Sequence, residues 1–289
     1  MATNHRPRNF PIRTMLKRLT MFQVHTDRPS ANLPAAMRHI VAAVPGSVAG
    51  ASPISLTGAQ QNELLRALGR DDLERLFPYL ELVQLKKGEY LYDFGSKFEY
   101  AYFPTNAIVS LHYVMEDGAT TEIAVVGREG VVGVALYANE RATCSAVVQV
   151  AGYGYRLKTE ALRDLFNEGG AFAQLMMRYT FAMFGQLAQN VVGTRHCTLE
   201  QKLSRWLLER LDRSLSSELK VTQETMATML GVRRESITLT AGKLQAEGLI
   251  QYRRGTIVVL DRNGLELSAG ACYKAGRIGF DQMRSHYTQ

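Results

Sequence analysis

Cysteine is scarce in this 289-residue sequence, which contains only Cys144, Cys197 and Cys272. An odd number of widely spaced cysteines matches neither a disulfide framework nor the C-x-x-C spacing of metal and redox motifs. An iron–sulfur cluster would require about four cysteine ligands. The sequence therefore predicts three reduced thiols in a reducing compartment. Cys144, alone in a strand-rich region, is more typical of a small core residue than of a redox-sensitive thiol.

Long apolar runs are also missing. A membrane-spanning helix needs about 18 or more consecutive apolar residues, and the most apolar stretch, IVAAVPGSVAGA at residues 40–51, is interrupted by Pro45, Gly46 and Gly50. The position of this stretch and its Pro-Gly pair also argue against a secretory signal. We therefore expect no membrane partner and a cytoplasmic location.

Acidic residues are rare in the first 55 residues, where Asp27 alone stands against seven Arg and Lys residues. The segment thus carries six of the seven excess positive charges of the chain. It is rich in proline and lacks a sustained helical or strand period, which predicts a basic disordered arm over residues 1–55. A true start at Met21 or Met37, an arm that touches nucleic acid and an amphipathic targeting segment remain alternatives.

Residues 56–165 are predicted to form a β-roll, a jelly-roll-like double-stranded β-helix, preceded by two short helices. The first helix is indicated by LTGAQQNELLRAL and opens at Thr57, and the second ends near Phe77. Short β-branched and aromatic runs follow, and these are LELVQLKKGEYLYDFG, YAYFPTNAIVSLHYV, TTEIAVV, GVVGVALYA and CSAVVQVAGYGYRL. A metal-dependent enzyme would need a ligand cluster, yet His112 is the only histidine between residues 80 and 160. We expect no catalysis and no metal or other cofactor.

A long amphipathic helix follows the roll. Apolar residues recur every three or four positions from about residue 172 onward, and LEQKLSRWLLERLDR continues as a connector helix, so that residues 166–212 are mainly helical. The polar stretch RSLSSELK at residues 213–220 predicts a domain boundary. His196, Cys197 and Glu200 lack a second convergent pair, and we interpret them as structural rather than as a metal or nucleophile site.

A helix pair is indicated by MLGVRRESITLTAGKL at residues 229–244. Thr222 is placed to cap the first helix, and Gly231 fits a left-handed turn after it. Apolar residues spaced by four and three then give the second helix a buried stripe, formed by Ile237, Ala241 and Leu244. The other side of this helix is polar and exposes Arg233, Arg234, Glu235 and Thr238.

Two apolar runs in LIQYRRGTIVVLD flank a basic tip and predict a β-hairpin beside the helix pair. Residues 213–262 are therefore predicted to form a winged helix-turn-helix, and residues 263–289 a C-terminal helical extension. Arginine can donate two hydrogen bonds to guanine, glutamate can accept one from cytosine, and hydroxyl groups can bind phosphate. The predicted DNA-binding residues are Thr222, Arg233, Arg234, Glu235, Ser236, Thr238, Arg253 and Arg254.

The stretch VTQETMATMLGVRRESITLTAGKLQAEGLIQYRRGTIVVL at residues 221–260 resembles the DNA-binding domain of the Crp/Fnr regulators, and a member of this family is among the known examples of helix-turn-helix docking. The order of parts over residues 56–262 agrees: a cyclic-nucleotide-binding-like roll, a long helix and a winged helix in an α+β fold. The resemblance places the base-reading Arg-Glu pair of the family on Arg234 and Glu235. A further arginine of the best-known member falls on Leu239, which leaves the operator sequence open.

The resemblance also implies a homodimer on a palindromic site of double-stranded DNA, acting in transcription regulation, with RNA polymerase as a possible further partner. The long helix would pair with its copy in a second subunit. The predicted dimer interface is the apolar stripe Phe172, Met176, Tyr179, Met183, Leu187 and Val191. Packing of this stripe on the chain's own roll is the alternative.

Cyclic-nucleotide receptors of this family hold the cyclic phosphate with an Arg-Ser pair and the ribose with a Glu that follows a glycine. A gapless match in GVALYANERATCSAVVQV puts Gly133 on the glycine, Val134 on the Glu, Cys144 on the Arg and Ser145 on the Ser. Of the three polar ligands only the serine is kept, so we expect a degenerate pocket and no dependence on cyclic nucleotides. In the alternative, Arg141 is a displaced phosphate ligand and the protein is a cyclic-nucleotide sensor.

Overall fold

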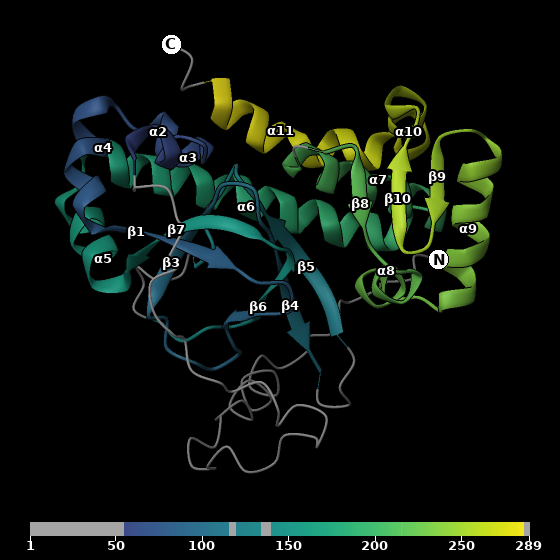
Figure 1. Cartoon of the computed structure of the whole chain (residues 1–289), viewed down its shortest axis with the longest axis horizontal. Helices are drawn as coiled ribbons and strands as arrows, with labels where there is room; N and C mark the ends of the chain where they lie inside the picture. The colour runs from purple at the N-terminus through teal and green to yellow at the C-terminus, as the bar shows by residue number, and fades with distance from the viewer. Residues whose placement is uncertain (1–54, 116–119, 134–139, 215, 286–289) are drawn as a thin grey trace, which may run out of the picture. The chain divides into compact units, whose positions relative to one another are not determined.

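The computed structural model describes residues 55–115, 120–133, 140–214 and 216–285, which all belong to one compact unit of the chain. It confirms the predicted α+β fold, with strands in the first part and helices around a small winged sheet in the second (Figure 1). The predicted basic arm lies outside the described residues except for Ser55, and so does Val134.

The first described segment contains short helices that are held by polar caps. They are α2 (Leu56–Ala59), α3 (Glu63–Ala67), α4 (Arg70–Leu76) and the 3-10 turn η3 (Phe77–Tyr79). Ser55 caps α2, so the helix begins before Thr57, where the sequence predicted its start. Asn62 caps α3 and also donates from Nδ2 to the carbonyls of Pro104 and Gly130, at 2.8 and 2.9 Å. This buried amide attaches the helices to the roll.

Two antiparallel sheets form the roll. One has the order β1-β7-β3 and the other β2-β6-β4-β5. The strands are β1 (Leu80–Leu85), β2 (Tyr90–Tyr92), β3 (Tyr100–Pro104), β4 (Ile108–Val114), β5 (Thr120–Val126), β6 (Ser145–Val150) and β7 (Gly152–Lys158). Four of the five predicted runs contain them. In the fifth, GVVGVALYA, the described residues make only an isolated bridge from Val132 to Tyr102.

The long helix of the sequence prediction is present as α6 (Gly170–His196), and a shorter helix, α5 (Thr159–Glu168), precedes it. The break between them lies at Gly169 and Gly170, whose φ angles of 79° and 72° are in the region that favours glycine. Apolar residues on one side of α6 pack into the hydrophobic core of the roll.

A second core belongs to the winged helix. It begins with α7 (Leu199–Arg213), which is capped reciprocally by Thr198 and Gln201, and its buried residues pack with those of α8 and α9. The other elements are β8 (Glu218–Lys220), α8 (Gln223–Leu230), α9 (Arg234–Ala246), β9 (Ile250–Arg253) and β10 (Thr256–Val259). Strand β8 joins the wing in a sheet of order β8-β10-β9, although the sequence indicated only a polar boundary there.

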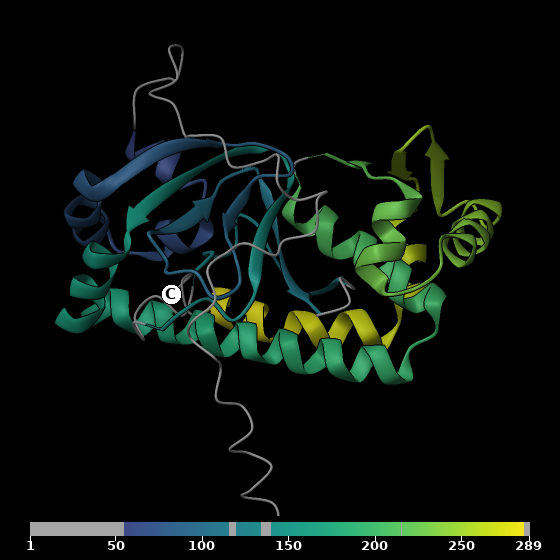
Figure 2. The same ribbon diagram turned by 90° about the horizontal axis from the view of Figure 1, so that it is seen from below.

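The C-terminal extension consists of α10 (Arg262–Ala269) and α11 (Ala271–Ser285). Helix α11 turns back along α6, as both views show (Figures 1 and 2). Tyr273 at its start lies in the winged-helix core, whereas Phe280 and Met283 lie in the roll core. One helix therefore packs into both cores, which the sequence did not indicate.

The sequence prediction of three free thiols is wrong for two of the cysteines. Cys197 and Cys272 form a disulfide, with their Cα atoms 6.7 Å apart, within the range that a disulfide spans. Their sequence separation of 75 was misleading, because the intervening domain begins and ends at the same place. Cys144 is a free cysteine that packs against the roll core, as expected.

Candidate DNA-binding surface

Helix α8 has the N-cap and the C-terminal turn that the sequence predicted. The Thr222 hydroxyl accepts a hydrogen bond from the backbone N–H of Thr225 at 3.1 Å and caps the helix. Gly231 ends it with φ 64° and ψ 37°, a left-handed conformation that costs glycine little. Three residues later α9 begins, so a tight turn joins the two helices, as predicted.

Helix α9 has one buried side and one exposed side. Ile237, Ala241 and Leu244 are at most 2% exposed and pack in the winged-helix core. On the other side, the residues that the sequence selected for base reading are exposed, and these are Arg233, Arg234, Glu235 and Thr238. Arg233 is the N-cap residue but makes no capping hydrogen bond with its side chain. The guanidinium groups of Arg233 and Arg234 thus lie at the N-terminal end of α9. This is the end that contacts base edges when a recognition helix lies in the major groove.

The hydroxyl groups of α9 are less available than its charges. Thr238 Oγ1 lies 2.9 Å from Gln223 Oε1 and 3.1 Å from the carbonyl oxygen of Arg234, so its proton is used within the protein. The contact with Gln223 joins α9 to the first turn of α8, a role that the sequence analysis missed. Ser236 is half-buried. Both hydroxyls retain lone pairs and can accept hydrogen bonds.

Two further residues complete the description of α9. The side chain of Leu239 is 76% exposed, although it is apolar and lies one turn after Glu235. Lys243 lies near the other end and is held by Glu200 of α7, with Nζ 2.5 Å from a carboxylate oxygen. The charged groups at the start of the helix are Arg233, Arg234 and Glu235, whereas Lys243, which is also exposed, is paired near the other end.

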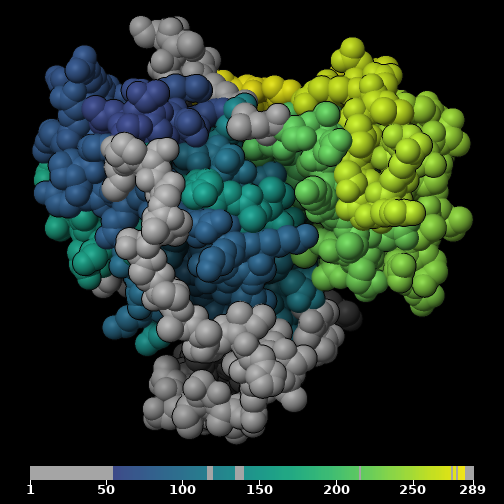
Figure 3. Space-filling view, viewed as in Figure 1, coloured from purple at the N-terminus to yellow at the C-terminus, as the bar shows by residue number. Residues whose placement is uncertain are grey.

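The wing is a two-stranded hairpin with a basic tip, as predicted. Arg254 and Gly255 form the turn, both with positive φ (43° and 79°), and Arg253 and Arg254 are exposed. The carbonyl of Gly255 accepts a hydrogen bond from the N–H of Val221 at 2.8 Å, which fixes the tip beside the start of α8. In the space-filling view α9 and the wing form part of the surface of the winged helix (Figure 3).

Buried ion pairs join α7 to the roll. Arg210 Nη2 lies 2.5 Å from Glu122 of β5, and Arg213 Nε lies 2.6 Å from Glu129. All four side chains are at most 7% exposed. The guanidinium of Arg210 also lies 3.4 Å from the ring centroid of Trp206. Burial lowers the pKa of Arg210 and the Glu122 carboxylate opposes this, so the pairing offsets part of the cost of burying both charges.

His112 belongs to the same buried network. Its Nε2 lies 2.6 Å from Ser110 Oγ, and the Ser110 hydroxyl donates to the carboxylate of Glu122. Burial lowers the pKa of His112, the Glu122 carboxylate opposes this, and Arg210 adds to the lowering. The imidazole is therefore mainly neutral near pH 7. It bonds Ser110 of its own strand, β4, and Ser110 in turn reaches Glu122 of β5.

Two residues of the predicted degenerate pocket, Ser145 and Arg141, hydrogen-bond to other groups of the chain. The Ser145 hydroxyl donates to the carboxylate of Asp93 and accepts from the N–H of Phe94 at 3.1 Å. Arg141 is exposed and donates to the carbonyl of Gly95 at 2.8 Å. Cys144 is half-buried, and burial raises the pKa of its thiol. Gly133, with φ 105°, is the last residue described before the gap.

Helix α6 carries two apolar stripes, and the structure revises the choice between them. Five of the six residues predicted as interface face the chain's own roll: Phe172, Met176, Tyr179 and Met183 are buried, and Leu187 packs against them. For these five residues the alternative prediction, packing on the chain's own roll, is the correct one, because the roll already covers their apolar surface. Only Val191 is exposed. The exposed stripe consists of Met177, Phe181, Phe184, Val191 and Val192, each at least 51% exposed.

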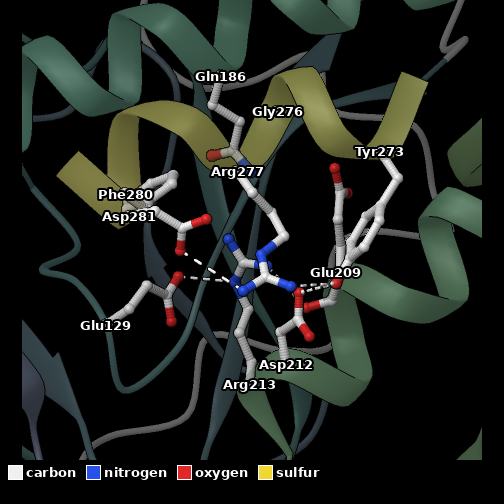
Figure 4. Close-up of a pocket in the computed structure, with 10 residues that line it drawn as sticks. All are labelled: Glu129, Gln186, Glu209, Asp212, Arg213, Tyr273, Gly276, Arg277, Phe280 and Asp281. Atoms are coloured by element: carbon white, nitrogen blue, oxygen red, sulfur yellow. Dashed lines mark hydrogen bonds and ion pairs between the residues drawn. The ribbon is translucent and has the colours of Figure 1, made fainter. Parts of the chain in front are cut away.

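A small polar pocket lies where the roll, α6, α7 and α11 meet (Figure 4). Arg213 and Arg277 lie in its centre, with Glu129 and Asp281 on one side. Its cavity volume is about 30 Å³, which suits water but is far too small for a nucleotide. The pocket lies at a junction of these elements, which ion pairs between arginines and carboxylates hold together.

Comparisons with known proteins agree with this architecture. Residues 82–168 match the sequence model of the cyclic nucleotide-binding domain, and residues 201–267 match that of the Crp-like helix-turn-helix domain. A search of curated proteins found no match. Together the two models cover more than half of the chain and follow the order of the roll and the winged helix. They define a DNA-binding regulator with a cyclic-nucleotide-binding-like domain.

Solved structures show the same fold. FixK2 from Bradyrhizobium japonicum is 17% identical with a TM-score of 0.59, over 66% of this chain and 98% of its own. The CRP-family regulator TTHB099 from Thermus thermophilus is 20% identical with a TM-score of 0.57, over 67% and 99%. The c-di-GMP-responsive regulator CLP from Xanthomonas campestris is 16% identical with a TM-score of 0.54, over 67% and 100%. The chain belongs to the Crp/Fnr family of transcription regulators. None of the helices described here is long and apolar enough to cross a membrane.

Proposed function

We propose that this protein binds a palindromic DNA site as a homodimer and regulates transcription from it in the cytoplasm, without catalysing a reaction. The exposed start of α9 carries this proposal. It presents Arg233, Arg234 and Glu235 on a helix that three buried residues hold in place, beside a wing with Arg253 and Arg254. The helix supplies groups for base edges and the wing supplies charges for phosphates. RNA polymerase is a further candidate partner of the bound dimer.

Each exposed residue has a chemical role in this proposal. Arg234 donates to guanine O6 and N7, and Glu235 accepts from cytosine N4. Leu239 stands where the family resemblance puts a further arginine. Its exposed apolar side chain suits the methyl group of thymine. Thr222 and Ser236 are candidates to donate a hydroxyl proton to a phosphate oxygen. Thr238, whose proton is used within the protein, can still accept a hydrogen bond from an amino group on a base edge. Operator preference should therefore include a G·C pair read by Arg234 and an A·T pair near Leu239.

The test is selection from random duplex DNA by the purified full-length protein, followed by sequencing of the bound pool. An enriched inverted repeat supports the proposal, with half-site centres spaced by about 10 base pairs or a multiple of this. Arg234→Ala serves as the altered reader, and Arg70→Ala, which removes an exposed arginine on α4, is the matched control. A pool without enrichment, or one that is the same for Arg234→Ala, contradicts the assignment of α9.

We infer that the dimer forms through the exposed stripe of α6. Phe181 and Phe184 are 71% and 69% exposed, one turn apart on a helix of 27 residues. Such a stripe on a surface helix is typical of a helix–helix interface. A symmetric pair of α6 helices would bring two winged helices to one palindrome.

Two substitutions separate the two stripes of α6. Phe181→Asp places a charge on the exposed stripe, so we expect a folded monomer by sedimentation that loses the palindrome. Met183→Asp places the same charge in the roll core, so we expect loss of cooperative unfolding. A dimeric Phe181→Asp variant that retains the palindrome would contradict the interface.

We further propose that DNA binding does not depend on cyclic nucleotides. The observation in favour is the Asp93 carboxylate on the Ser145 hydroxyl, because it places a negative charge where a cyclic phosphate would need donors. Arg141, the candidate substitute, is turned to the Gly95 carbonyl. Calorimetric titration should give no binding of cyclic AMP or cyclic GMP. Micromolar binding that Arg141→Ala abolishes would restore the sensor alternative.

A further inference from the structure

The disulfide between Cys197 and Cys272 lies at the base of the winged helix, where the chain enters and leaves this domain. Cys197 is the C-cap of α6, and α7 begins two residues later. Cys272 is the second residue of α11, just after α10 has completed the domain. The bond therefore closes a loop that contains α7, α8, α9, α10 and the wing. As a consequence, both ends of the domain are fixed at one point.

Noncovalent contacts at the same place make this base continuous with α11. The phenol of Tyr273, next to Cys272, donates to Asp212 of α7 at 2.8 Å and accepts from Arg262 of α10 at 2.9 Å. Ser204 and Ser268 join α7 and α10 at 2.9 Å. From there α11 continues into the roll core with Phe280 and Met283. The disulfide thus joins the end of α6 to the start of α11, beside the hydrogen bonds that attach α7 and α10 to α11.

Both cysteines are partly exposed, so neither lies in the interior of the protein. Their helix positions differ: Cys272 lies in the first turn of a 15-residue helix and Cys197 at the end of a 27-residue helix. The dipole at a helix N-terminus stabilises a thiolate, and the C-terminal end opposes one. Cys272 is therefore the attacking thiol, and Cys197 the resolving one.

We propose that Cys197 and Cys272 form a reversible redox site that fixes the orientation of the winged helix and thereby sets DNA affinity. The oxidant is a small-molecule disulfide of the glutathione type. The Cys272 thiolate attacks one sulfur of this disulfide, forms a mixed disulfide and releases one thiol. The Cys197 thiolate then attacks the Cys272 sulfur, forms the protein disulfide and releases the second thiol. Two protein thiols are oxidised, one disulfide is reduced to two thiols, and the protein protons pass to the released thiols through solvent.

Oxidation should favour DNA binding, a step that rests on the proposed function. In the bonded form the reading residues of α9 are exposed, and the orientation of the domain is restricted by a second covalent connection. A dimer must place two such domains on one palindrome, and restriction before binding lowers the entropy lost on binding. We expect the oxidised protein to bind its operator about three- to tenfold more tightly than the reduced protein.

The first test needs no DNA. Full-length protein is equilibrated in glutathione buffers of varied ratio, the thiols are trapped by alkylation, and the fraction with the protein disulfide is measured. A Cys144→Ser background removes the third thiol and is the matched control. We expect reversible oxidation, faster alkylation of Cys272 in Cys197→Ser than of Cys197 in Cys272→Ser, and a Tm lower by about 5 °C or more after reduction. A pair that never oxidises, or that millimolar glutathione cannot reduce, overturns the redox site.

The second test measures affinity by fluorescence anisotropy, with the selected operator and a scrambled duplex, for the oxidised and reduced forms. The Cys197→Ser/Cys272→Ser variant should bind like the reduced protein at every glutathione ratio, and Cys144→Ser should respond like the unchanged protein. Equal or weaker binding of the oxidised form, or a response that persists in the double variant, overturns the coupling. If no duplex is bound specifically in either form, the proposed function fails, while the thiol titration still decides the redox site.

Discussion

The arginines of α7 and those of the recognition surface are the same residue type in opposite environments. Arg210 and Arg213 are buried, and each touches a carboxylate of the roll. Arg233, Arg234, Arg253 and Arg254 are exposed. Burying a guanidinium without a fixed carboxylate partner costs free energy, so Arg210 and Arg213 serve to join α7 to the roll. An exposed one keeps its donors for a ligand, and the comparison thus separates structural arginines from those that can bind DNA.

Breaking a buried pair should have the largest effect. Glu122→Ala leaves Arg210 buried without its carboxylate, and we expect the free energy of unfolding to fall by about 3–5 kcal/mol. Urea denaturation followed by circular dichroism measures this loss. Arg234→Ala in the same experiment should stay within about 0.5 kcal/mol of the unchanged protein, because its side chain is exposed. Equal losses in both variants would remove the distinction between the two groups of arginines.

The recognition helix should show the opposite pattern. Arg234→Ala is expected to weaken binding to the selected operator by about 1–3 kcal/mol and to relax the preference at one position of each half-site. The reason is the loss of a bidentate contact to one guanine. Anisotropy titrations with operators substituted at each position measure both effects. An unchanged preference with reduced affinity would reassign Arg234 to phosphate contact.

The wing arginines sharpen the comparison further, because they should act on every sequence alike. For Arg253→Ala we expect affinity for operator and scrambled duplex to fall in the same proportion. The slope of log affinity against log salt should flatten by about one, the value for one lost phosphate contact. Titrations at several salt concentrations give this slope. A loss confined to the operator would instead place Arg253 on a base.

Local signals explain why the recognition surface could be predicted from the sequence. The Thr222 cap, the Gly231 turn and the stripe through Ile237 all lie within a few residues of the groups that they position. The ion pairs of Arg210 and Arg213 join residues more than 80 positions apart, and no pattern near either partner indicates which carboxylate it meets. The periodicity of α6 was detected, but both of its apolar stripes satisfy a helical period. Only the packed roll shows which stripe is covered.

The same long-range packing hid the role of the C-terminal extension. Residues 263–289 were predicted as helical, yet Tyr273 and Phe280 enter different cores. The disulfide was missed for the same reason, since counting and spacing of cysteines do not show that the ends of the winged helix meet. Tertiary packing decides these features, whereas helix caps and turns are decided locally.

The smallest effect concerns the pH dependence of the buried joint. Burial lowers the pKa of His112, so below its ordinary value of about 6.5 the unfolded chain takes up a proton that the folded chain refuses. The contribution of His112 to stability is therefore present above about pH 6.5 and is lost as the pH falls from there toward the folded pKa. The slope from this one group cannot exceed about 1.4 kcal/mol per pH unit. His112→Gln keeps a hydrogen-bonding group near Ser110 but does not titrate. Urea denaturation from pH 7.5 to 5 should show a shallower loss of stability for this variant than for the unchanged protein, and equal slopes would mean that His112 is not the group that couples the joint to pH.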